Sequence, residues 1–195
     1  WSRRSCVTAR SPSPSAGLMS ARPFFITGLP RSRTAWMAVA ATTANSVCHH
    51  EPGHGDFASA AELWGRPSIR SVGISDSGLG MHLPRILAEI GPRTLIVQRD
   101  PAQVVASYAR YADTELGVVG EMVGHRLQVL MGRLFEVESP LVRRVDFDAL
   151  NDIETVRDCL GWLGVRAHNL EQLMRMNIQS DLRFNMAKAQ ALVAA

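Results

Sequence analysis

Short apolar segments bounded by polar or turn-forming residues recur along the chain and predict buried β-strands. Continuous apolar runs of this length are typical of strands that are covered on both faces of a parallel sheet. The clearest run lies at residues 94–98, which have an apolar centre of leucine, isoleucine and valine. The pattern predicts strands at residues 24–27, 69–74, 94–98 and 141–145, with a further strand that leads into a histidine-rich loop.

Apolar residues spaced three and four apart predict helices between these strands. The longest helix is expected over residues 111–138, where one apolar stripe comprises Leu116, Val119, Val123, Leu127, Leu130 and Leu134. Shorter helices are expected at residues 35–44, 57–64, 82–90, 153–163 and 168–176, and from Pro101 onward. The alternation predicts a three-layer α/β domain, with a central, mostly parallel sheet of about four or five strands flanked by helices.

The N-terminal residues differ in composition from the rest of the chain. Residues 1–18 are rich in serine, proline and arginine and show no hydrophobic periodicity. They also lack the apolar core of a signal peptide. We expect either a disordered leader or an upstream stretch that is not native to the protein, with Met19 as the natural start. Residues 19–195 are expected to form a single domain.

Charge and cysteine content exclude several function classes. Of the 21 basic residues three lie in residues 1–18, which leaves 18 basic against 18 acidic residues and no general basic surface for nucleic acid. No apolar run approaches the ~20 residues of a membrane span, so no membrane partner is expected. Cys6, Cys48 and Cys159 are far apart and form no C-x-x-C motif, which favours reduced thiols and a cytoplasmic setting.

Residues 23–36, P-F-F-I-T-G-L-P-R-S-R-T-A-W, join a predicted strand to a predicted helix through a polar turn. The turn contains Gly28, Pro30, Arg31, Ser32, Arg33 and Thr34. Turn amides and the first amides of a helix lack internal partners, and arginines and hydroxyls suit a phosphate or sulfate. The alternative is a solvated basic loop. The turn does not match the Walker A pattern, because Thr34 stands at the lysine position and Ala35 at the hydroxyl position, which weakens an ATPase or kinase interpretation.

A second candidate anion site follows the strand at residues 94–98. Arg99 ends that strand, and Asp100 and Pro101 are suited to the N-cap and the first turn of a helix. Arg99 beside a helix N-terminus suits an anion. A structural arginine paired with Asp100 is the alternative.

Three histidines, His49, His50 and His54, lie close together in a predicted loop. Residues 50–54 spell H-E-x-x-H, the zinc-protease signature. That motif requires a continuous helix, whereas Pro52 and Gly53 stand between the two histidines, so a zinc-protease site is not expected. A structural metal clip built from His49, His50 and His54 is the less favoured alternative. The loop is instead expected at the carboxyl end of a strand, where open α/β sheets bind their ligands, and Asp76 and Ser77 are expected at the end of another.

Two of these segments resemble the nucleotide-binding motifs of sulfotransferases. Residues 30–36 are similar to the 5′-phosphosulfate loop P-[KR]-S-G-T-T-W and agree at five of seven positions, with Arg33 replacing the glycine and Ala35 the second threonine. Residues 99–107 resemble the 3′-phosphate motif R-D-P-x-x-V-x-x-S, with Arg99 and Ser107 at its ends. The resemblance covers residues 23–165 and implies a P-loop-type fold. The family's C-terminal arginine-lysine-glycine loop has no counterpart in residues 180–195.

The resemblance implies transfer of a sulfuryl group from 3′-phosphoadenosine 5′-phosphosulfate (PAPS) to a hydroxyl or amine of a small-molecule or carbohydrate acceptor, without a metal. It implies that residues 28–34 hold the 5′-phosphosulfate, that Arg31 stabilises the leaving oxygen, and that Arg99 and Ser107 bind the 3′-phosphate. Trp36 stacks on adenine in this scheme, or else is a core residue. Glu51 or His50 is the implied base. The alternatives are an ATP-dependent P-loop phosphotransferase and a catalytically inactive nucleotide-binding domain.

Overall fold

The computed structural model describes residues 21–51, 68–112 and 116–176. The expected leader, the helix expected at residues 57–64 and the C-terminal residues 180–195 lie outside these ranges. None of the helices in the described ranges combines the length and the apolar character that crossing a membrane requires.

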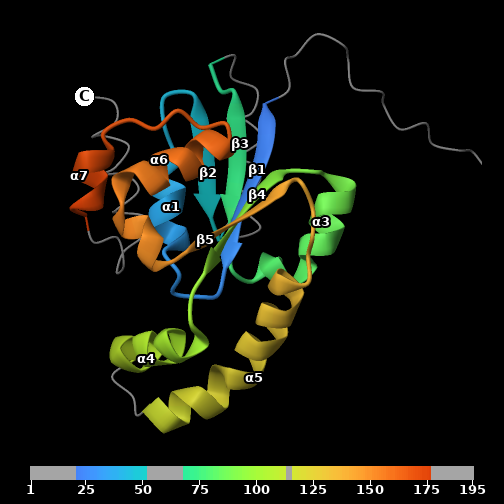
Figure 1. The fold of residues 1–195 in the computed structure, drawn as a ribbon, viewed down its shortest axis with the longest axis vertical. Helices are drawn as coiled ribbons and strands as arrows, with labels where there is room; N and C mark the ends of the chain where they lie inside the picture. The colour runs from blue at the N-terminus through green and yellow to red at the C-terminus, as the bar shows by residue number, and fades with distance from the viewer. Residues whose placement is uncertain (1–20, 52–67, 113–115, 177–195) are drawn as a thin grey trace, which may run out of the picture.

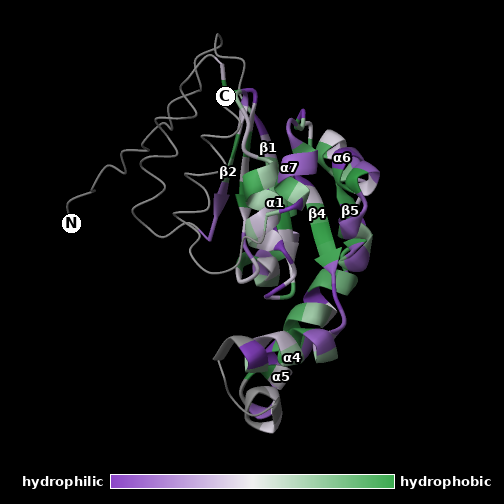
Figure 2. Ribbon diagram, turned by 90° about the vertical axis from the view of Figure 1, so that its left-hand side faces the viewer, coloured by the Kyte–Doolittle hydropathy of each residue, from purple (hydrophilic) through white to green (hydrophobic). Residues whose placement is uncertain are grey.

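Within the described residues, five strands form one parallel sheet, as the sequence predicts. The strands are β1 (Arg22–Gly28), β2 (Ser46–His50), β3 (Ser71–Ser75), β4 (Arg93–Gln98) and β5 (Val142–Asp146). Their order is β2-β3-β1-β4-β5, so β1 and β4, the most apolar strands, occupy the interior of the sheet (Figures 1 and 2). All carboxyl ends of the strands therefore meet at one edge.

Helices cover both faces of the sheet and complete the three-layer architecture (Figure 1). One face is covered by α1 (Thr34–Ala40), α6 (Ile153–Trp162) and α7 (Leu170–Met174). The other is covered by α3 (Leu83–Glu89) and α5 (Leu116–Phe135), and α4 (Pro101–Ala112) packs with them in the same core but lies below the carboxyl ends of the strands. Short 3-10 helices η1 (Leu79–His82) and η2 (Asp148–Asn151) follow β3 and β5.

Strand alternation divides the apolar side chains between two cores. Phe24 and Ile26 of β1 pack with α1, α6 and α7, whereas Phe25 packs with α3, α4 and α5. Successive side chains of a strand point to opposite faces, so a continuous apolar run fills both cores at once. The three-layer prediction from apolar runs is thus confirmed.

Two predicted helices differ from the structure at their ends. The helix expected over residues 111–138 is α5, which spans Leu116–Phe135, while Tyr111 and Ala112 belong to α4. The helix expected at residues 35–44 is α1, which begins at Thr34 and ends at Ala40. Beyond that end, the Thr42 hydroxyl donates to the carbonyl of Ala38 (2.9 Å) and Thr43 pairs with Ser46, so the backbone leaves the helix for β2.

Candidate active site

The loop between β1 and α1 brings the backbone into close contact with β4. Gly28, the last residue of β1, pairs with Val97, and a Cβ atom at Gly28 would lie 2.5 Å from the Val97 carbonyl oxygen. Only glycine permits this approach. Arg31 and Arg33 follow with φ angles of 65° and 61°, in the left-handed region that glycine adopts most readily. Arg33, which replaces the glycine of the sulfotransferase motif, therefore has the backbone conformation suited to that glycine.

Ser32 lies between these two strained residues and is fully buried. In the part of the chain that the structure describes, its hydroxyl has no hydrogen-bond partner. Buried hydroxyls in folded proteins are almost always paired, so this hydroxyl is available to a bound acceptor. An oxygen of a phosphate or sulfate would supply an acceptor.

The two arginine motifs identified in the sequence meet in the structure. An Nη1–H of Arg99 donates to the backbone carbonyl of Arg31. The Nε–H of Arg31 in turn donates to the Ser107 hydroxyl on α4 (3.3 Å). Asp100 is engaged elsewhere, because its carboxylate accepts from the Ala102 amide (2.8 Å) at the start of α4. Arg31, Arg99 and Ser107 thus form one connected group at the carboxyl edge of the sheet.

Arg33 and Arg99 also share an aromatic neighbour that sequence reasoning missed. The guanidinium carbon of Arg33 lies 4.9 Å from the centre of the Phe147 ring, and that of Arg99 lies 4.0 Å from it. Asn151 accepts a hydrogen bond from Nη2 of Arg33 (2.6 Å). Phe147 directly follows β5, the neighbour of β4, so its place at this edge could have been inferred, but no motif marked it.

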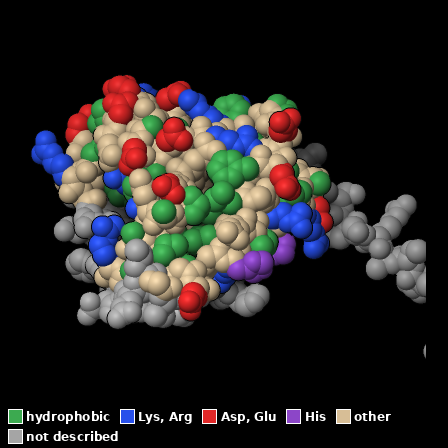
Figure 3. All heavy atoms as spheres, turned by 60° about the horizontal axis from the view of Figure 1, so that its bottom comes forward, with side chains coloured by type: hydrophobic (Ala, Val, Ile, Leu, Met, Phe, Trp, Pro, Cys, Tyr) green, Lys and Arg blue, Asp and Glu red, His purple; other side chains and the backbone are tan. Residues whose placement is uncertain are grey.

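The site concentrates positive charge. Burial lowers the pKa of Arg99, and the charges of Arg110, Arg31 and Arg33 lower it further, while Asp148 opposes them. Such mutual repulsion favours a bound anion. Figure 3, which brings the lower part of Figure 1 forward, shows basic and acidic side chains interspersed around hydrophobic ones on this face.

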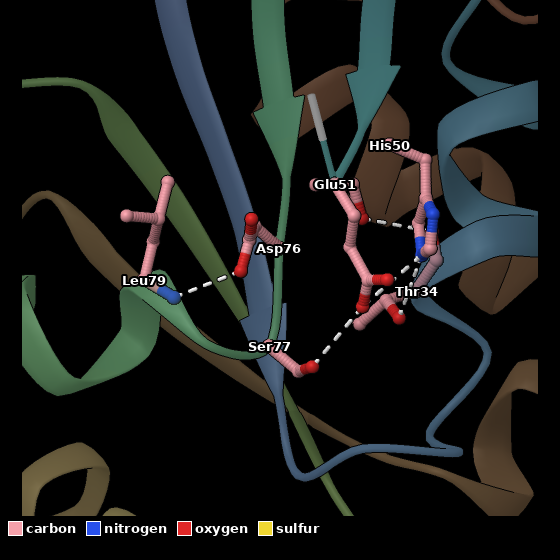
Figure 4. A network of polar contacts seen from close by, with 7 residues as sticks. Thr34, His50, Glu51, Asp76, Ser77 and Leu79 are labelled. Carbon is pink, nitrogen blue, oxygen red and sulfur yellow. Dashed lines mark hydrogen bonds and ion pairs between the residues drawn. The ribbon is translucent and has the colours of Figure 1, made fainter. Parts of the chain in front are cut away.

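A second polar group lies at the ends of β2 and β3 (Figure 4). Nε2 of His50 is 3.4 Å from the Thr34 hydroxyl and 3.9 Å from Oε1 of Glu51. That same carboxylate oxygen accepts a hydrogen bond from Ser77 (3.3 Å). Asp76, the neighbour of Ser77, instead accepts from the amide of Leu79 (2.8 Å) at the start of η1.

The His50 side chain is largely buried, with the Glu51 carboxylate beside it. Burial lowers the pKa of His50, against the opposing charges of Glu51 and Asp76, so the imidazole is neutral at pH 7. The Glu51 side chain is 54% exposed. Through Thr34 this group joins the β1–α1 loop, so the two candidate bases lie beside the candidate anion site.

Trp36 takes no part in this arrangement, and of the H-E-x-x-H segment only His50 and Glu51 lie within the described residues. Trp36 is 7% exposed in the core, and its indole N–H donates to the carbonyl of Leu173 (3.1 Å), which favours the core role over adenine stacking. His54 lies outside the described residues, among which no group of three or more His, Cys, Asp or Glu side chains could hold a metal. Pro30 is half-buried in the turn.

Comparison with known proteins shows which fold the chain has. No family model matches the sequence, and no curated protein matches it. Among solved structures, the sulfotransferase domain from the curacin biosynthetic pathway is similar, with a TM-score of 0.53 and 13% identity over 83% of this chain and 79% of that one. The sulfotransferase domain from the Synechococcus PCC 7002 olefin synthase is similar over 95% of this chain and 99% of that one, with a TM-score of 0.53 and 10% identity. At these identities the comparison shows the fold, and the chain therefore has the P-loop-like three-layer fold of sulfotransferase domains.

Proposed function

We propose that the chain is a sulfotransferase that moves a sulfuryl group from PAPS to a hydroxyl or amine of a small-molecule or carbohydrate acceptor. The observation that carries the proposal is the direct contact between the two arginine motifs, from Arg99 to Arg31 and from Arg31 to Ser107. Two anion-binding groups on adjacent strands suit a nucleotide with phosphate at both its 3′ and 5′ positions. The sulfotransferase-type fold supports the same assignment.

The β1–α1 loop fits the 5′-phosphosulfate. Its backbone approaches β4 closely at Gly28, and its buried Ser32 hydroxyl lacks a partner within the described residues. Arg31 and Arg33 supply charge-assisted hydrogen bonds, and Thr34 supplies a further hydroxyl. Arg99 and Ser107 would hold the 3′-phosphate on the α4 side of the loop.

The chemistry assigned to the chain's own residues is positioning, charge stabilisation and proton removal. PAPS supplies the sulfuryl group, whose bond to the bridging oxygen breaks as the acceptor's oxygen or nitrogen bonds to sulfur. Arg31 stabilises the electron pair that stays on the bridging oxygen. The acceptor's proton passes to neutral His50, which lies 3.4 Å from the Thr34 hydroxyl, or to the Glu51 carboxylate, which lies 3.9 Å from His50.

Binding of adenosine 3′,5′-bisphosphate, measured by calorimetry, tests the nucleotide assignment. We expect it to bind more tightly than AMP or ADP, and Arg99→Ala to abolish the advantage of the 3′-phosphate. Arg85→Ala is the matched control, because Arg85 lies on α3 with its side chain 77% exposed and pairs with Glu89. A preference for ATP with magnesium would indicate a phosphotransferase. Absence of binding to any of these nucleotides would contradict the nucleotide-binding assignment.

Turnover of PAPS with an accepting substrate tests the chemistry. Arg31→Ala should lower the rate about a hundred- to a thousandfold, as loss of a transition-state donor does. Loss of the true base should lower it about a hundred- to ten-thousandfold, so comparison of His50→Asn with Glu51→Gln identifies that residue. Unchanged turnover in Arg31→Ala would contradict the mechanism.

A further inference from the structure

The turn after β5 holds two arginines of the candidate site through one aromatic ring. Phe147 lies within 4.0 Å of the guanidinium carbon of Arg99 and 4.9 Å of that of Arg33, measured from the ring centre. These arginines belong to different motifs, one after β4 and one before α1. A single ring therefore links the loop assigned to the 5′-phosphosulfate with the arginine assigned to the 3′-phosphate.

Phe147 is itself firmly positioned. Its backbone N–H donates to the carbonyl of Gln98 (2.7 Å), the residue directly before Arg99. Its side chain is partly buried and packs against the core on the α1 and α6 face of the sheet. The ring is thus tied to β4 on one side and to the core on the other, and it offers a fixed surface.

The same turn contributes one hydrogen bond and one carboxylate charge near the arginines. Asn151, at the end of η2, accepts a hydrogen bond from Arg33 (2.6 Å). The Asp148 carboxylate acts electrostatically on both guanidinium groups and raises their pKa values, against the effect of burial. Residues 147–151 therefore offer both arginines negative or electron-rich partners.

Two neighbouring guanidinium groups repel one another and, when unbound, favour separate solvated positions. An aromatic face attracts a cation, and the attraction grows as the cation is desolvated. Arg33 and Arg99 are both partly buried, and burial lowers the pKa of each. A shared ring thus lowers the cost of keeping both charges close together before the anion arrives.

We propose that Phe147 is a positioning residue that holds the guanidinium groups of Arg33 and Arg99 together, so that both are directed at the phosphate and sulfate groups of the nucleotide. The role in nucleotide binding rests on the proposed function, whereas the contact itself does not. Arg33 replaces a glycine of the sulfotransferase motif, and the proposal assigns it to nucleotide binding, with its guanidinium group held by Phe147 and Asn151.

The contact is tested without any ligand by NMR of the arginine side chains. Ring currents of Phe147 should shift the Nε–H signals of Arg33 and Arg99, assigned with Arg33→Lys and Arg99→Lys. Phe147→Leu should remove both shifts while retaining an apolar side chain, and Phe147→Tyr should retain them. Absence of ring-current shifts in the native protein would overturn the proposal regardless of what the protein binds.

The effect on binding is tested by calorimetry with adenosine 3′,5′-bisphosphate. Loss of two partly desolvated cation–π contacts should weaken binding about five- to thirtyfold in Phe147→Leu, and Phe147→Tyr should restore it to within about twofold. Phe135→Leu is the matched control, because Phe135 ends α5 with 45% exposure.

The outcomes separate this proposal from the function on which it rests. A Phe147→Leu protein that melts at a lower temperature but binds with native affinity would show a merely structural role and overturn the proposal. Native protein with ring-current shifts but no affinity for the bisphosphate would overturn both the nucleotide-binding role and the proposed function, while the arginine contacts would stand. If Phe147→Leu does not fold, the shifts in the native and Phe147→Tyr proteins decide the matter.

Discussion

The closest backbone approach in the candidate site gives the sharpest prediction. Replacing Gly28 with alanine places a Cβ atom 2.5 Å from the carbonyl oxygen of Val97 and 3.3 Å from the Val97 carbonyl carbon and Cβ. These distances are shorter than van der Waals contact, and the first two involve backbone. Val97 and its neighbours Ile96 and Leu95 are at most 1% exposed, so β4 cannot move aside freely.

Gly28→Ala should therefore destabilise the protein by about 1–3 kcal/mol, the usual cost of an added methyl group in a packed interior. For a chain of this size that corresponds to a fall in Tm of about 3–10 °C. Displacement of the loop should also weaken binding of adenosine 3′,5′-bisphosphate, because Arg31 and Ser32 follow within four residues. Circular dichroism melting and calorimetry measure the two effects.

Gly161→Ala is the matched control. Gly161 lies on α6, and nothing is within 4 Å of the position that its Cβ would occupy. The same change should stabilise the helix by up to about 1 kcal/mol, because alanine favours helix more than glycine does. A Tm for Gly28→Ala at or above the native value would show that the end of β1 does not press against β4, and would refute the reasoning.

Three further predictions test other parts of the structure. Leu130→Ala should lower the free energy of unfolding by about 2–5 kcal/mol because Leu130 is buried. Val129→Ala, at a position 38% exposed, should lower it by under ~0.5 kcal/mol. Equal losses for the two variants in urea denaturation would contradict the orientation of α5. Burial lowers the pKa of His50 in the folded protein, so the contribution of His50 to stability is complete above its unfolded pKa near 6.5 and is lost as the pH falls through the folded pKa. His50→Asn should therefore flatten the acid side of the profile of stability against pH, measured by denaturant titration. An unchanged profile would contradict this assignment. Cys48 and Cys159 are fully buried, and burial raises the pKa of each thiol. A Cys6→Ser protein should therefore react with Ellman's reagent only after denaturation. Rapid reaction of this variant in its folded state would contradict the burial of the two thiols.

Much of the secondary structure followed from local patterns. The apolar runs that end at Thr27 and at Gln98 gave the two central strands because a strand buried on both faces needs a continuous apolar stretch. Leu127, Leu130 and Leu134 of the predicted stripe likewise lie on the buried face of α5. Helix ends were less predictable, because the end of α1 depends on the Thr42 and Thr43 contacts with residues outside it.

The candidate site was predicted in part. Gly28 ends β1, Arg31 lies in the turn that follows and Arg99 comes directly after β4, as the sequence predicts, and a parallel sheet brings its carboxyl ends to one edge. The bond from Arg31 to Ser107 joins residues 76 positions apart, and no local pattern could indicate it. Phe147 was missed because an aromatic residue after a strand resembles ordinary core packing until its cationic neighbours are known.

The sequence by itself determined the strands, the polar turn between β1 and α1, and the chemical types of the site residues, because these depend on residues adjacent in the chain. The tertiary structure alone decided the strand order β2-β3-β1-β4-β5, the burial of Trp36 and the shared contact of Arg33 and Arg99 with Phe147. These features depend on contacts between distant segments, whose free energies reflect packing of the whole domain rather than any local preference.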